Sequence, residues 1–151
     1  EAAKQVEFRG VYLDLLDLYN YIKKKDYQYP STPSLSHMFA LDYQLDRILE
    51  EGLENRFARH LEMARYVRQW AKENFALFPE EKYASNTLTT VKNTKNISVA
   101  DLNKKLGEYG YMISNGYGDL KEVTFRIAHM ADTTLDEIKE LLSVIDKVLL
   151  Q

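Results

Sequence analysis

The sequence predicts an α+β fold in which a helical stalk precedes a small β-α-β-β-α domain. Three observations indicate this architecture. Apolar residues recur at helical spacing up to about residue 75, and stretches rich in β-branched residues follow after Pro79. The chain then ends in a strongly amphipathic segment, which predicts a final helix against a core.

The first part of the stalk reads as a helix followed by a proline-rich loop. Residues 11–25 have apolar side chains at helical spacing and end in three lysines, which suit a helix C-terminus. The segment DYQYPSTPS contains two prolines three residues apart, and residues before proline avoid the helical region. We therefore expect an extended loop, with Thr32 as N-cap and Pro33 as first residue of the next helix.

Two longer helices complete the stalk. Leu35, Met38, Phe39 and Leu45 recur at helical spacing until Gly52, which ends or interrupts the helix. A further helix is predicted over about 54–75, and it stops before Pro79.

The remaining residues alternate between strands and helices. SNTLTTVKN, from Ser85, is rich in β-branched residues and predicts a strand. Ser98 is expected to cap a helix that runs to about Glu108, and Thr134 with Glu137 forms a capping box before the last helix. Between these helices the sequence predicts strands over 111–114 and 123–130, joined by the loop NGYGDLKE.

Composition and charge exclude several classes of function. The 151 residues have a formal net charge of −3, and no basic block exceeds the three lysines at 23–25, so nucleic acid is a poor candidate partner. The absence of cysteine excludes disulfides and thiolate metal sites. No apolar run reaches about 18 residues and no signal core is visible, so we expect a cytoplasmic protein without a membrane partner.

The three histidines do not indicate a metal centre. His37, His60 and His129 have no acidic or histidine partner at the spacing of metal ligands. We therefore predict that the protein binds no metal.

Arg126 lies in the middle of the strand TFRIAHM, between two residues that favour a core. Side chains alternate along a strand, so Phe125 and Ile127 share one face and Arg126 lies on the other. Arginine is mostly exposed in proteins, and a surface strand explains it. A binding arginine also explains it, because its planar fork holds a carboxylate or phosphate through two hydrogen bonds. The residues alone leave both interpretations open.

Two further segments are candidates for binding. Tyr29, Thr32 and the adjacent Ser31 and Ser34 place four hydroxyls at a helix start, where free N–H groups and the helix dipole favour phosphate. An ordinary N-cap explains the same residues. In NGYG, Asn115, Gly116 and Gly118 permit a close backbone approach to a ligand, although a plain turn between strands explains the segment as well.

The sequence also resembles a known family. YPSTPSLSHMFALDYQLDRILEEGLENRFARH and, later, FRIAHMADTTLDEIKELL resemble the C-terminal part of class V (alanine–glyoxylate/serine–pyruvate type) pyridoxal-phosphate-dependent aminotransferases. The equivalent family patterns look like Y-x-x-T-P, EEGLENR-x-x-RH and FRIGHMG. The likeness covers nearly the whole chain, and its combination of motifs is specific. It departs from the family at Ala128 and Ala131, where the family often has glycine.

The resemblance implies a role for each candidate. Arg126 matches the arginine that binds the substrate α-carboxylate. Tyr29 and Thr32 match the pair that reaches the cofactor phosphate of the other subunit in a homodimer. The implied reaction moves an amino group between a small amino acid and a 2-oxo acid on pyridoxal 5'-phosphate. Which amino acid and oxo acid take part is left open, as is the aminotransferase or desulfurase branch of the family.

The resemblance also implies that much of the enzyme lies elsewhere. Residues 1–33 would be the tail of a large cofactor domain, 34–76 connecting helices, and 77–151 the small C-terminal domain of a fold-type I aminotransferase. The lysine that holds the cofactor would belong to the large domain, since no lysine here has a desolvated setting. We therefore expect the isolated chain to be inactive. The alternative is a free-standing α+β ligand-binding or regulatory module that uses Arg126 and NGYG.

Overall fold

The computed structural model describes residues 2–8, 10, 14–24, 29 and 31–150. It divides into two compact units, residues 1–47 and 48–151, which are described separately. No helix in the described ranges is long and apolar enough to span a bilayer.

The first unit contains the 3-10 helix η1 (Ala2–Gln5), helix α1 (Leu15–Lys24) and most of α2 (Leu35–Glu51). Of the predicted helix over 11–25, residues 11–13 and 25 lie outside the described residues. The Asp14 carboxylate accepts a hydrogen bond from the Leu16 backbone N–H at 2.9 Å and so supports the start of α1.

Helix α2 begins at Leu35, so the prediction that Thr32 caps it and Pro33 opens it is wrong. The Ser34 carbonyl accepts the first helical hydrogen bond, from Met38 N–H at 3.1 Å. The Ser34 hydroxyl lies 2.7 Å from His37 Nδ1 and forms a hydrogen bond with this side chain in the first turn of the helix. Thr32 is left exposed ahead of the helix, and its side chain is not needed to start it.

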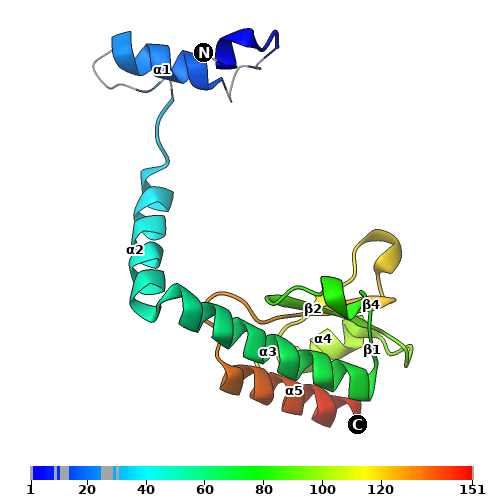
Figure 1. Ribbon diagram of the computed structural model, residues 1–151. Helices are drawn as coiled ribbons and strands as arrows, with labels where there is room; N and C mark the ends of the chain where they lie inside the picture. Colours follow the sequence, from blue (N-terminus) through cyan, green and yellow to red (C-terminus); the bar gives the residue numbers. More distant parts are fainter. Residues whose placement is uncertain (1, 9, 11–13, 25–28, 30, 151) are drawn as a thin grey trace. The chain divides into compact units, whose positions relative to one another are not determined.

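The second unit is an antiparallel sheet with helices on one side (Figure 1). Its sheet has the order β1-β2-β4-β3, and the predicted α+β class is confirmed. In chain order, the elements are α3 (Leu53–Asn74), β1 (Ala76–Leu77), η2 (Glu81–Tyr83), β2 (Leu88–Lys92), α4 (Val99–Gly107), β3 (Ser114–Asn115), η3 (Gly118–Leu120), β4 (Thr124–Ala128) and α5 (Leu135–Leu149).

The core forms between the sheet and its helices. Helices α3 and α5 lie side by side, and α4 contacts α5 (Figure 1). Phe125 and Ile127 of β4 and Val91 of β2 are fully buried in this layer. The Phe75 ring meets Phe125 edge to face, with centroids 5.2 Å apart, a favoured arrangement for buried aromatic pairs. The alternation of β4 therefore directs Arg126 to the opposite face of the sheet.

Both predicted caps of the second unit are confirmed. The Ser98 hydroxyl accepts a hydrogen bond from Asp101 N–H at 3.1 Å. Thr134 and Glu137 form a reciprocal capping box at the start of α5. Such caps satisfy backbone donors that a helix leaves unpaired at its first turn.

Two strands differ from the predictions. The strand predicted over 111–114 is reduced to Ser114–Asn115, because backbone donors before it are used by α4. Tyr111 N–H bonds the Leu106 carbonyl, and Ile113 N–H bonds the Asn103 side chain at 2.8 Å. The short strand β1 was not predicted at all, and it exists through its pairing with β2.

Gly52 joins α2 to α3 and has a φ of +81°, which suits glycine and few other residues. Its N–H ends α2 on the Ile48 carbonyl at 3.0 Å, and its carbonyl starts α3 on Arg56 N–H. The apolar residues of α3 pack in the same hydrophobic core as the strands and helices that follow it. The division into 1–33, 34–76 and 77–151 stays a prediction about the larger protein.

His129 is a buried polar residue next to β4, with none of its surface exposed. Its Nδ1 lies 3.1 Å from the Asn86 carbonyl, which can only accept, so Nδ1 holds the proton. Nε2 then accepts from the Thr89 hydroxyl at 2.9 Å. Burial lowers the pKa of His129, the hydrogen bond to Asn86 opposes this, and the Arg68 charge adds to the lowering.

We expect the free energy of unfolding to decrease as the pH is lowered below about 6.5, the pKa of a histidine in the unfolded chain. In this pH range the histidine of the unfolded chain binds a proton, whereas buried His129 stays neutral. The free energy of unfolding then decreases by up to about 1.4 kcal/mol per pH unit. Urea unfolding between pH 5 and 7 measures this slope. His129→Gln should flatten it, whereas the control His37→Gln, on the exposed surface of α2, should leave it unchanged. An unaltered slope in His129→Gln would contradict the assignment.

Candidate functional site

Arg126 stands at the centre of β4, with Thr90 of β2 and Ser114 of β3 as its cross-strand partners. Its side chain is half-buried, and Nη2 donates a hydrogen bond to the Asn115 carbonyl at 3.0 Å. Nε is buried and has no hydrogen-bond partner. In the described part of the chain, no carboxylate pairs with this guanidinium. Arg126 therefore has a buried hydrogen-bond donor that no described residue satisfies.

The Tyr117 ring lies against this guanidinium. Arg126 Cζ is 4.2 Å from the ring centroid, within the range of a cation–π contact. The neighbouring Arg126 side chain lowers the pKa of the Tyr117 hydroxyl. The two side chains are therefore joined by a cation–π contact on the sheet face opposite the helices.

The segment that holds Tyr117 is fixed by a polar network around Asn115. The Asn115 Oδ1 accepts hydrogen bonds from Gly116 N–H at 2.8 Å and Glu122 N–H at 2.9 Å. Its Nδ2 donates to Glu122 Oε1 at 2.5 Å, and the other Glu122 oxygen accepts from Val99 N–H at 2.7 Å. Asn115, predicted as a cleft residue, therefore supports the loop while its backbone carbonyl contacts Arg126.

Each of the two predicted glycines of this loop is required by the structure for a different reason. Gly118 has a φ of +53°, which glycine adopts without strain. A Cβ on Gly116 would overlap the Leu120 carbonyl and crowd the Thr124 hydroxyl. The residues Asn115, Gly116 and Gly118 thus hold the loop in place, and their direct contact with a ligand stays a prediction.

Tyr29 and Thr32 belong to the first unit, and both are exposed. Neither hydroxyl has a hydrogen-bond partner among the residues that the structure describes. They precede the first turn of α2, where N–H groups lack helical partners. Of the neighbouring hydroxyls, Ser34 is occupied by His37 and Ser31 is exposed.

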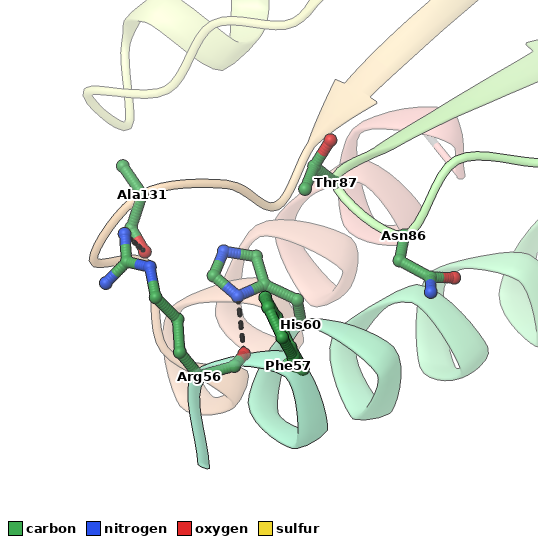
Figure 2. A pocket seen from close by; sticks show the side chains of 6 residues that line it. All are labelled: Arg56, Phe57, His60, Asn86, Thr87 and Ala131. Atoms are coloured by element: carbon green, nitrogen blue, oxygen red, sulfur yellow. Dashed lines mark hydrogen bonds between the residues drawn. The ribbon is translucent and has the colours of Figure 1, made fainter. Parts of the chain in front are cut away.

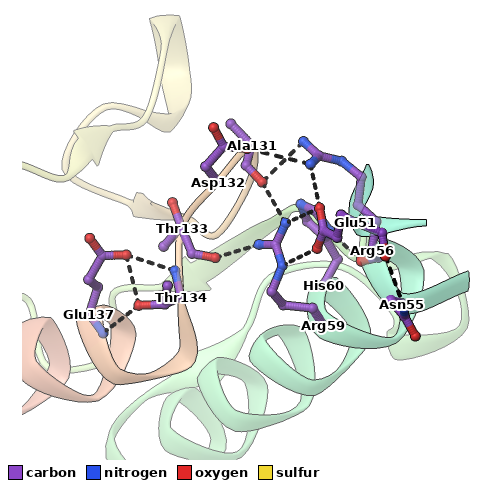
Figure 3. A network of polar contacts seen from close by, with 10 residues as sticks. All are labelled: Glu51, Asn55, Arg56, Arg59, His60, Ala131, Asp132, Thr133, Thr134 and Glu137. Carbon is purple, nitrogen blue, oxygen red and sulfur yellow. Dashed lines mark hydrogen bonds and ion pairs between the residues drawn. The ribbon is translucent and has the colours of Figure 1, made fainter. Parts of the chain in front are cut away.

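Figure 3 shows a second polar network, which follows β4. Glu51 lies between Arg59 and Arg56, with contacts of 2.6 Å and 2.8 Å. Hydrogen bonds from Arg59 lower the pKa of Glu51 to about 2; burial opposes this lowering, and hydrogen bonds from Arg56 add to it. Both arginines also donate to the Ala131 carbonyl, where the backbone φ is +58°. The network therefore fastens the loop after β4 to the start of α3.

A cavity of about 350 Å³ adjoins this network (Figure 2). It is lined by Arg56, Phe57, His60, Asn86, Thr87 and Ala131. Arg56 is already bonded to Glu51, the Ala131 carbonyl and Asp132, and His60 Nδ1 lies 2.7 Å from the Arg56 carbonyl. The charge of Arg56 is therefore neutralised by carboxylates of the protein. None of the predicted site residues lines the cavity.

Sequence reasoning missed Tyr117 and the role of the two α3 arginines. An aromatic residue between two glycines of a predicted loop was a usable signal for Tyr117. The stretch EEGLENRFAR was a signal for the network, since Glu51, Arg56 and Arg59 stand around a helix-breaking glycine. In both cases the partner lies far along the chain, and spacing alone does not identify it.

Known proteins resemble this chain over part of their length. An uncharacterised aminotransferase of Methanocaldococcus jannaschii is 34% identical over 142 residues, which are 93% of this chain and 37% of that protein. The serine–glyoxylate aminotransferase of Arabidopsis thaliana is 28% identical over 154 residues, which are 99% and 38%. No family model matches the sequence.

Solved structures resemble the fold. The pyridoxamine–pyruvate aminotransferase of Mesorhizobium loti superposes with a TM-score of 0.82 at 26% identity, covering 97% of this chain and 38% of that one. The alanine–glyoxylate aminotransferase of a Nostoc species gives the same TM-score at 23% identity, covering 97% and 40%, and shows the fold alone. The chain thus spans about two fifths of the length of the proteins it matches. The homologues of this chain are thus aminotransferases of the alanine/serine–glyoxylate class V type, and the chain corresponds to a C-terminal portion of them.

Proposed function

We propose that the protein containing this chain transfers an amino group between a small amino acid and a 2-oxo acid, and that Arg126 binds the substrate carboxylate. Aminotransferases of this class depend on pyridoxal 5'-phosphate, which supplies the carbonyl that exchanges the amino group. The single observation that supports the role of Arg126 is its half-buried guanidinium, with an unsatisfied Nε and no carboxylate partner in the described residues.

The geometry of Arg126 suits this task. The guanidinium presents several N–H donors in one plane, and a carboxylate accepts two of them in parallel. The Asn115 carbonyl occupies Nη2, while Nε has no partner. A carboxylate that satisfies Nε has a fixed orientation, and the amino group attached beside it is then held in one place.

We assign the cofactor phosphate to Tyr29 and Thr32. Both hydroxyls are exposed and unbonded within the described ranges, ahead of a helix whose first N–H groups favour an anion. In a homodimer these residues would bind the phosphate held by the other subunit. The residues present thus fit two anions, a substrate carboxylate and a phosphate.

The lysine that anchors the cofactor is assigned to the rest of the protein. Every lysine in the ranges that the structure describes is exposed, and a lysine that forms a Schiff base needs desolvation or a cationic neighbour. We therefore expect the 151 residues alone not to transaminate. A ligand-binding module that used Arg126 without catalysis would bind carboxylates in the full-length protein and give no turnover.

Arg126→Lys tests the carboxylate assignment in the full-length enzyme. Lysine keeps the charge but loses the two-pronged geometry. We expect kcat/KM for amino acids to fall by about 2 kcal/mol or more, the scale of a charge-assisted pair, while simple amines are affected far less. Steady-state kinetics with L-serine and ethanolamine measure the difference.

The matched control is Arg65→Lys, an exposed arginine on α3. It should leave both substrates unaffected. Melting temperature and cofactor content should stay normal in either variant, because Arg126 lies on the face opposite the core. Equal losses for the amino acid and the amine in Arg126→Lys would show an ordinary strand arginine.

Thr32→Val tests the phosphate assignment, since it keeps the side-chain shape and removes the donor. A hydrogen bond to a charged group is worth about 1.5–3 kcal/mol, so cofactor affinity should fall about tenfold or more. Equilibrium dialysis measures the loss, which should worsen on dilution if the site spans a dimer. The control Thr94→Val changes an exposed threonine of the second unit and should retain the cofactor. Unchanged affinity in Thr32→Val would refute the role.

A further inference from the structure

The loop before β4 is built to place one aromatic ring. Asn115 and Glu122 close it through two hydrogen bonds, and Asn115 Oδ1 also accepts one from Gly116 N–H. A Cβ at Gly116 would overlap the Leu120 carbonyl, so the position has no room for a side chain. Gly116 N–H also bonds the Thr124 carbonyl at 2.9 Å, and Leu120 N–H bonds the Tyr117 carbonyl at 3.0 Å. The backbone on both sides of Tyr117 is therefore fixed.

The Tyr117 side chain itself is outside the core. It is 78% exposed, yet its ring lies 4.2 Å from Arg126 Cζ. An exposed tyrosine that served only solubility would need no such partner. The contact instead links an exposed residue of the loop to Arg126, the arginine of β4.

Stacking restrains an arginine in a way that a carboxylate partner does not. All N–H donors of a guanidinium lie in its plane, so an aromatic ring over the flat face fixes that plane and leaves the edge available. A carboxylate of the protein would use the same edge and compete with substrate. The ring also removes water from one face, which strengthens electrostatic binding at the edge.

We propose that Tyr117 is a positioning residue for substrate binding: its ring holds the plane of the Arg126 guanidinium so that the N–H edge meets the substrate carboxylate. This inference rests on the proposed role of Arg126. Tyr117 acts through the arginine and needs no contact with the reacting atoms.

The test uses the full-length, cofactor-loaded enzyme and two reagents that modify the bound cofactor. Aminooxyacetate has a carboxylate, and methoxyamine has the same reactive group without one. In Tyr117→Leu, the second-order rate constant for aminooxyacetate should fall about tenfold, the scale of a lost cation–π contact with some misplacement of the arginine. The rate constant for methoxyamine should stay within about twofold of the parent, as expected for an unchanged reaction centre.

Two matched variants make the result specific. Tyr117→Phe keeps the ring and should restore the aminooxyacetate rate constant to within about twofold of the parent, because the ring face provides the contact. Tyr109→Leu removes another cation–π contact, with Lys147 at 5.0 Å, and should behave as the parent with both reagents.

Each contrary result has one meaning. A Tyr117→Leu enzyme that matches Tyr109→Leu, or that loses both reagents equally, overturns the positioning role. A Tyr117→Phe enzyme as impaired as Tyr117→Leu assigns the effect to the hydroxyl and overturns the stacking role. Arg126→Lys is measured in parallel. If it fails to separate the two reagents, the carboxylate assignment itself is wrong; if it separates them while Tyr117→Leu does not, only the present inference fails.

Discussion

The two-residue alternation of β4 is the constraint on which the core and the site both depend. Phe125 and Ile127 enter the helix layer without exposed surface, so Arg126 between them must face the other way. A shift of one residue in the register would bury the guanidinium and expose both apolar side chains. The hydrophobic core therefore determines on which face of the sheet the arginine lies.

Polar networks then secure both ends of this strand. Before it, Asn115 and Glu122 tie the loop that supports Tyr117. After it, Arg56 and Arg59 hold the Ala131 carbonyl against the start of α3, with Glu51 between them. The charges of the second network are satisfied within the fold, whereas Arg126 has no carboxylate partner in the described ranges. This difference distinguishes Arg56 and Arg59 from Arg126, for which we propose a binding role.

Local signals explain which parts of the fold were predictable. The caps at Ser98 and Thr134 and the alternation around Arg126 depend on residues close in sequence, and they were predicted correctly. Strand β1 and the bounds of β3 depend on pairing with distant strands and on donors used by α4, which no local pattern encodes. The start of α2 was misplaced because several hydroxyls could cap it and the His37 contact of Ser34 was not foreseen.

The family resemblance indicated Arg126 as a carboxylate-binding residue, and this role stays a prediction. The contact of Arg126 with Tyr117 could not be predicted, because it depends on the geometry of the loop before β4. The most direct measurement is a crystal structure of the full-length enzyme with its cofactor and a bound 2-oxo acid. If Arg126 binds substrate, a carboxylate oxygen lies about 2.7–3.2 Å from its Nε, with Tyr117 still stacked on the guanidinium. A carboxylate held elsewhere, with Nε of Arg126 bonded to water or to protein, would contradict the assignment.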